Sequence, residues 1–104
     1  MNKSTRIPTR IRIGNQMYSI DVVESMRRKA TMGRTYYDLG RIEIGASSNL
    51  TGRKFSDAEI DDTFWHEVTH AILYDMGHRL YNDEHFVTEF SGRLAKAIKS
   101  AKFK

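Results

Sequence analysis

The sequence predicts an α+β fold in which a small, mainly antiparallel sheet of three or four strands packs on two C-terminal helices. Three observations lead to this prediction. Residues 10–45 contain runs of alternating apolar and polar side chains, the period of a half-buried strand, and residues 57–76 and 83–101 each repeat apolar side chains at helical spacing. Because 104 residues suit one compact unit, we expect a single domain over residues 1–104.

Two strand pairs are predicted in the N-terminal half of the chain. The first is a hairpin in which residues 10–14 and 16–23 alternate on either side of the turn Gly14-Asn15. The second lies in TYYDLGRIEIG, where a turn at Leu39-Gly40 precedes a strand. Ile42 and Ile44 should lie on one face of that strand, and the charged side chains between them on the other.

The two predicted helices have clear boundaries. Ser56 is followed three residues later by Glu59, which is a capping-box signature, and apolar residues recur every fourth position from there to residue 76. Gly77 then suits a left-handed C-terminal cap. The second helix is predicted from about residue 83 to 101, and its apolar stripe should form the buried side: Phe86, Val87, Phe90, Leu94 and Ile98.

The composition narrows the chemistry that the chain can carry. The absence of cysteine means that any metal must be bound by His, Asp or Glu. No apolar run resembles a signal or a membrane span, so we expect a cytoplasmic protein without a membrane partner. The net charge is +4, and residues 1–54 carry 11 Lys or Arg against 4 acids. A nucleic-acid partner for this basic half is therefore one hypothesis.

The four histidines lie between positions 66 and 85, and two of them, His66 and His70, fall inside the first predicted helix. Residues four apart project from the same face of a helix, so both imidazoles can bind one ion. Glu67 completes the His-Glu-x-x-His pattern that is typical of zinc metalloproteases. In that chemistry zinc lowers the pKa of water, and the glutamate accepts the proton as general base. We therefore expect one Zn²⁺ per chain and hydrolysis of a peptide or protein substrate.

A catalytic zinc site needs a third protein ligand, and the segment after the motif offers several. The candidates are His78, Asp83, Glu84, His85 and Glu89. Glu84 lies at the edge of the apolar side of the second helix, from which it can face the first helix. Glu89 also lies beside that apolar side, next to Phe86 and Phe90, and is the second choice. His85 follows Glu84 directly, so the two side chains point about 100° apart and cannot face the metal equally.

With these residues in view, the chain resembles the compact zinc metallopeptidases of the ImmA/IrrE group, particularly minimal versions among phage and prophage proteins. The resemblance covers about residues 36–98 and rests on YYDLGRIEIG, TFWHEVTHAILYDMG and NDEHFVTEFSGRL. It implies a gluzincin-like site with His66, His70 and Glu84 on zinc and Glu67 catalytic. It also implies that the protein is located in the host cytoplasm if it is phage-encoded. The 14 residues from His70 to Glu84 are fewer than larger members of the group use.

His85 permits a second comparison, with the SprT-like metalloproteases, whose third ligand is a histidine and which act on DNA-bound proteins. Under that resemblance His85 replaces Glu84 as the third ligand. The oxyanion formed during hydrolysis would need a hydrogen-bond donor besides zinc, and the candidates are Tyr74, His78, Tyr81 and His85. If the strand around residues 41–44 lies at a sheet edge near the cleft, an extended substrate can pair with it.

Two other functions fit the same sequence. In the first, the metal is structural or the site is degenerate, and the protein is a non-catalytic module that binds a host or phage protein. In the second, the basic N-terminal half binds nucleic acid, and the histidine helix is incidental or localises a protease on DNA. A three-ligand site with a general base exceeds what a structural metal needs, so we prefer the hydrolase.

Overall fold

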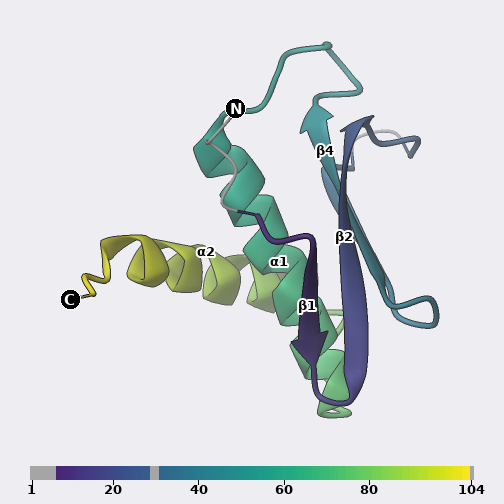
Figure 1. The fold of residues 1–104 in the computed structure, drawn as a ribbon, viewed down its shortest axis with the longest axis vertical. Coiled ribbons are helices and arrows are strands. Elements are labelled where there is room, and N and C mark those ends of the chain that lie inside the picture. The colour runs from purple at the N-terminus through teal and green to yellow at the C-terminus, as the bar shows by residue number, and fades with distance from the viewer. Residues whose placement is uncertain (1–6, 29–30, 104) are drawn as a thin grey trace.

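The computed structural model describes residues 7–28 and 31–103, which form four strands and two helices (Figure 1). The elements are β1 (Arg10–Ile13), β2 (Gln16–Ser25), β3 (Gly33–Tyr36), β4 (Arg41–Ser47), α1 (Asp57–Asp75) and α2 (Glu84–Ser100). This is the predicted α+β fold, with a mostly antiparallel sheet followed by two helices. Neither of the described helices is long and apolar enough to cross a membrane.

The four strands form one sheet in the order β1-β2-β4-β3. The pairs β1/β2 and β3/β4 are antiparallel, as predicted, and Gly14 and Gly40 adopt the positive φ that their tight turns require. The two hairpins are joined by a parallel pairing of β2 with β4, in which Ile20 lies opposite Ile42 and Val22 opposite Ile44. Local alternation did not predict this parallel joint.

The strand around residues 41–44 is not an edge strand, so the condition under which a substrate was predicted to pair with it is not met. β4 has β2 on one side and β3 on the other, which uses the hydrogen-bonding groups of both its edges. Within the described sheet, the strand at this end is β3, whose pairing is with β4 alone. The free edge beside α1 therefore belongs to residues 33–36.

One face of the sheet packs against α1 and forms the hydrophobic core. The buried side chains of this core are Ile13, Tyr18, Ile20, Ile42, Ile44, Phe64, Val68 and Ala71. On the opposite face, the Arg41 guanidinium lies 3.0 Å from Asp21 Oδ2 and 2.6 Å from Glu43 Oε2. The alternation predicted for β4 is thus confirmed, with its isoleucines inside and its charged residues outside.

α1 begins and ends close to where the sequence predicts. The Ser56 hydroxyl accepts a hydrogen bond from the backbone N–H of Glu59, and the Glu59 carboxylate accepts one from Ser56 N–H, so both halves of the capping box are present. The helix ends at Asp75, and Gly77 has a φ of 66° just beyond it. These caps place the His-Glu-x-x-His segment in the middle of a 19-residue helix.

α2 lies across α1 (Figure 1), and the face that it buries agrees only in part with the predicted stripe, of which Val87 is buried and Phe86 and Leu94 are half-buried. Its buried residues are Val87, Ser91 and Ala95, whereas Phe90 and Ile98 are 49% and 40% exposed. Within the described residues, α2 packs on α1 rather than on a strand. A helix that touches a single neighbour covers only a narrow strip, and small side chains in that strip let the two helices approach closely.

Candidate metal centre

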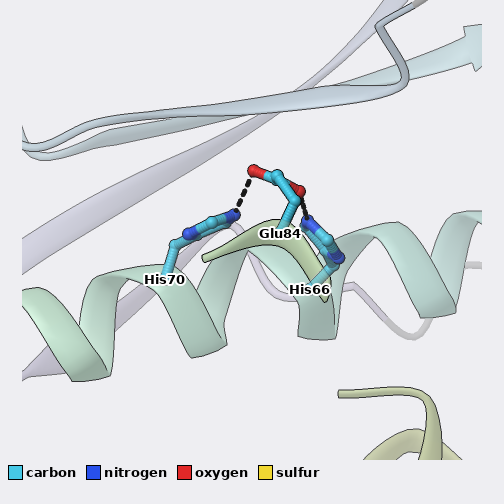
Figure 2. A group of neighbouring side chains, drawn as sticks. All are labelled: His66, His70 and Glu84. Carbon is cyan, nitrogen blue, oxygen red and sulfur yellow. Dashed lines mark hydrogen bonds and ion pairs between the residues drawn. The ribbon is translucent and has the colours of Figure 1, made fainter. Parts of the chain in front are cut away.

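Two histidines of α1 face the first residue of α2 (Figure 2). His66 Nε2 lies 3.0 Å from Glu84 Oε1, and His70 Nε2 lies 3.0 Å from Glu84 Oε2. One ligand atom from each of the three residues lies within 4.8 Å of the other two. The two imidazoles are one turn apart on the same helix face, and the Asp83 cap at the start of α2 brings the carboxylate between them.

The orientation of His70 is fixed from its other ring nitrogen. His70 Nδ1 lies 2.6 Å from the backbone carbonyl oxygen of Tyr81, and because a carbonyl only accepts, Nδ1 carries the proton. The unprotonated Nε2 of His70 can then offer its lone pair to a metal ion held with His66 and Glu84. A ligating histidine commonly donates its second N–H to a carbonyl or carboxylate in this way, which fixes its tautomer.

The donor set fits a zinc ion. Two imidazole nitrogens and one carboxylate oxygen are the ligands of a catalytic zinc site that keeps one position open. His70 is 5% exposed, whereas the Glu84 side chain is 69% exposed, so the group has one wall in the protein and one side toward solvent. A substrate could therefore reach an ion held here without displacing a protein ligand.

The Glu67 carboxylate is buried beside this group, and β3 holds it there. Thr35 Oγ1 donates a hydrogen bond to Glu67 Oε1 at 2.7 Å, and Glu67 is only 6% exposed. Burial raises the pKa of Glu67 above its ordinary value, while the hydrogen bond from Thr35 and the neighbouring histidines oppose that rise. The residue between the two histidines is thus set apart from solvent and oriented by the edge strand.

Gly33 is what allows β3 to come so near. A Cβ atom at this position would lie 2.6 Å from Thr63 Cγ2 and 3.2 Å from Glu67 Cγ. A larger residue here would require the Thr63 side chain or the edge strand itself to shift. The close approach of strand and helix therefore depends on a residue without a side chain.

Two cavities open on either side of Glu67. One, of about 440 Å³, is lined by residues that include Gly33, Asp62, His66 and Glu67. The other, of about 340 Å³, is lined by Arg28, Thr31, Arg34, Thr35, Tyr37, Glu67, His70, Asn82 and Glu84. Glu67 thus lines both cavities, with His66 in the first and with His70 and Glu84 in the second.

The other residues predicted for this site lie elsewhere. In the described structure, the group of potential metal ligands does not include His85, which is exposed, or Glu89, which pairs with Arg93 at 2.7 Å. His78 Nδ1 accepts a hydrogen bond from Leu80 N–H, so it stabilises the turn after α1. The rings of Tyr74 and Tyr81 pack together in an aromatic cluster with Tyr37.

Sequence reasoning missed three residues at this site, Gly33, Thr35 and Tyr37. All three lie in or directly after β3, 20 to 24 positions before the start of the motif helix. No spacing rule connects them to His66 or His70, because their proximity depends on how the sheet packs against α1. The only signal in the sequence was the presence of polar side chains in a short strand.

An α+β domain whose motif helix supplies His-Glu-x-x-His, with an acidic donor from the following helix, defines the zincin-like class of metal-site proteins. Within that class the chain belongs to the SprT-like family, whose model matches residues 6–103. This family is related to metallopeptidases. No curated protein and no solved structure matches the chain.

Proposed function

We propose that this protein is a zinc-dependent peptidase in which His66, His70 and Glu84 bind the metal and Glu67 is the general base. The observation that carries the proposal is the convergence of three ligand atoms within 4.8 Å beside a buried carboxylate. A structural metal needs no such carboxylate, whereas hydrolysis does. The narrower resemblance to the ImmA/IrrE group and the phage origin remain predictions.

The residues of the site suggest how the reaction proceeds. Zinc bound there would supply a Lewis acid that polarises a peptide carbonyl and lowers the pKa of water. Thr35 holds one oxygen of the Glu67 carboxylate, which leaves the second oxygen to accept a proton from the attacking water. Glu67 then donates that proton to the leaving amine, and the C–N bond breaks.

The test of this proposal uses the wild-type protein. We expect it to bind one zinc ion per chain, measured by elemental mass spectrometry, and to cleave fluorescein-labelled casein. The chelator 1,10-phenanthroline should remove the zinc and the cleavage together, and added zinc should restore both. A protein that binds zinc tightly but cleaves no casein would instead favour a non-catalytic, zinc-containing module.

The edge strand β3 is the place where an extended substrate would bind. Its outer edge carries backbone groups that are free of sheet pairing in the described structure, and Gly33 and Thr35 bring that edge to Glu67. Backbone hydrogen bonds would then supply much of the affinity. Peptide substrates with methylated backbone amides should lose cleavage; unchanged cleavage of the methylated peptides would exclude pairing with β3.

The hydrogen bond from Thr35 should contribute measurably to the rate. We expect Thr35→Val to lower kcat about 10- to 100-fold, because a hydrogen bond to a charged acceptor contributes about 1.5–3 kcal/mol. Thr35→Ser keeps the hydroxyl and should recover most of the rate. The measurement is casein cleavage at matched zinc content.

A matched control for this variant lies on α1. The Thr69 hydroxyl is buried and donates to the carbonyl of Trp65, away from the Glu67 carboxylate. Thr69→Val makes the same chemical change and should leave kcat within about twofold of wild type. An equal loss in Thr35→Val and Thr69→Val would argue against a specific role for Thr35.

A nucleic-acid partner is a second candidate function. Arg27, Arg28, Arg34 and Arg41 line a cavity of about 550 Å³ beside β3 and β4. Arg28 and Arg34 also line the cavity that contains His70 and Glu84, so a bound phosphate backbone would lie next to the metal centre. Retention on DNA that falls as salt rises would support this partner, and no retention at low salt would exclude it.

A further inference from the structure

Tyr37 is the aromatic residue that lines the cavity on the His70 side of the candidate metal centre. It follows β3 directly, and the cavity that it lines also contains Glu67, His70 and Glu84. Tyr74, which the sequence suggested as a donor, instead lines a separate cavity with Ile13, Asn15, Gln16, Tyr18, Tyr37 and Asp75. Of the aromatic cluster, Tyr37 is therefore the member that lines both cavities.

The ring of Tyr37 is held in place from two sides. It stacks on Tyr74 with ring centroids 4.1 Å apart and an interplanar angle of 18°, and its edge contacts Tyr81 at 5.9 Å. The backbone carbonyl oxygen of Tyr81 accepts a hydrogen bond from His70 Nδ1–H. Tyr81 thus contacts the Tyr37 ring with its side chain and orients the His70 imidazole with its backbone carbonyl.

The Tyr37 phenol is a neutral hydrogen-bond donor in this setting. Partial burial, together with the charge of Glu67, raises the pKa of the Tyr37 phenol above its ordinary value of 10.0. The phenol therefore stays protonated at neutral pH. Among the other donors of this cavity, Thr35 already donates to Glu67, and Arg28, Arg34 and Asn82 are exposed. Thr31 and Tyr37 are the two remaining half-buried hydroxyl donors of this cavity, and a phenol, which is more acidic than an aliphatic hydroxyl, is the stronger hydrogen-bond donor of the two.

We propose that the Tyr37 hydroxyl donates a hydrogen bond to the carbonyl oxygen of the scissile peptide bond as negative charge develops on it. This inference rests on the proposed peptidase function and assigns the oxyanion donor to the residue directly after β3 rather than to Tyr74, His78, Tyr81 or His85. A donor that is fixed before the reaction stabilises the developing charge without reorganising. The hydroxyl transfers no proton; Glu67 carries the proton as described above.

The test compares tyrosine-to-phenylalanine variants within one aromatic cluster. In the zinc-loaded full chain, Tyr37→Phe should lower kcat for labelled casein about 100-fold, the usual effect of removing one oxyanion donor, with KM, zinc content and Tm unchanged. Tyr74→Phe makes the same change on the ring that stacks on Tyr37 and should stay within about twofold of wild type.

A binding measurement separates this inference from the proposed function. The probe is a phosphinic peptide that copies the sequence cleaved in casein, and calorimetry should show its affinity for Tyr37→Phe reduced by a factor similar to the loss in kcat. An active wild-type protein whose Tyr37→Phe variant keeps both its kcat and its phosphinate affinity overturns this inference alone. A wild-type protein that binds zinc but neither cleaves casein nor binds the phosphinate overturns the proposed function and this inference with it.

Discussion

Replacing Glu84 by alanine is expected to lower the zinc affinity more than about a hundredfold and to abolish casein cleavage with it. Removing a residue that only hydrogen-bonds to a ligating histidine already lowers metal affinity about 10- to 100-fold, so removing a ligand itself should lower it more. The Glu84 side chain is 69% exposed, so its removal should leave the fold intact. Zinc content by elemental mass spectrometry and titration with a zinc chelator measure the effect.

The controls for this variant are its neighbours on α2. His85→Ala removes the alternative third ligand, and Glu89→Ala removes the second-choice carboxylate, which pairs with Arg93. Both should keep wild-type zinc content. If His85→Ala lost zinc while Glu84→Ala kept it, the third ligand would be the histidine that the SprT-like resemblance implies, and the assignment of Glu84 would be wrong.

His70→Ala should lose zinc as well, but it needs a separate measurement of stability. His70 is buried, and its removal also takes away the N–H that donates a hydrogen bond to the Tyr81 carbonyl oxygen. A buried acceptor left without a donor costs about 1–3 kcal/mol of unfolding free energy. Urea denaturation of the zinc-free proteins distinguishes this structural loss from the loss of the metal ligand.

Glu67→Gln is expected to lower kcat about 10²- to 10⁴-fold while zinc content stays at the wild-type level, because glutamine cannot accept a proton as a general base. The substitution keeps the size of the side chain, and the amide oxygen can still accept the hydrogen bond from Thr35. Its effect should therefore fall on kcat, with little change in KM. Steady-state cleavage of casein at matched zinc content measures it.

Asp62→Asn is the matched control for Glu67→Gln. Asp62 lies on the same helix and lines the same cavity as Glu67, but it is exposed and outside the group of potential metal ligands. It should leave kcat within about twofold of wild type. A Glu67→Gln protein with full activity would rule out the proposed general base.

Local patterns predicted the elements of this fold because each pattern reflects the geometry of a single segment. Alternation predicted both hairpins, and the pair Ser56 and Glu59 predicted the start of α1. The spacing of His66 and His70 alone placed two imidazoles on one face of that helix. The strand period of two residues and the helix period of nearly four are both visible within a few positions of the sequence, so they can be recognised without knowing the tertiary structure.

The pairing of distant segments could not be predicted in the same way. The parallel contact between β2 and β4 makes β3 the edge strand. The alternation within each hairpin would be the same if the two hairpins were joined through other strands, so it could not predict this order. The buried face of α2 was predicted correctly at Val87 but wrongly at Phe90 and Ile98, which would be covered only if a second element packed there. Both outcomes depend on which surfaces meet, which hydrophobicity along one segment does not specify.

The sequence by itself determined that two histidines and a glutamate share one helix, and therefore which metal chemistry the chain can offer. Tertiary structure decided what completes the site: Glu84 reaches both imidazoles from the next helix, and Thr35 and Tyr37 reach the same place from the edge strand. The physical reason is that ligand spacing on a helix is fixed by its backbone geometry, whereas contacts between elements are fixed by packing of the whole chain.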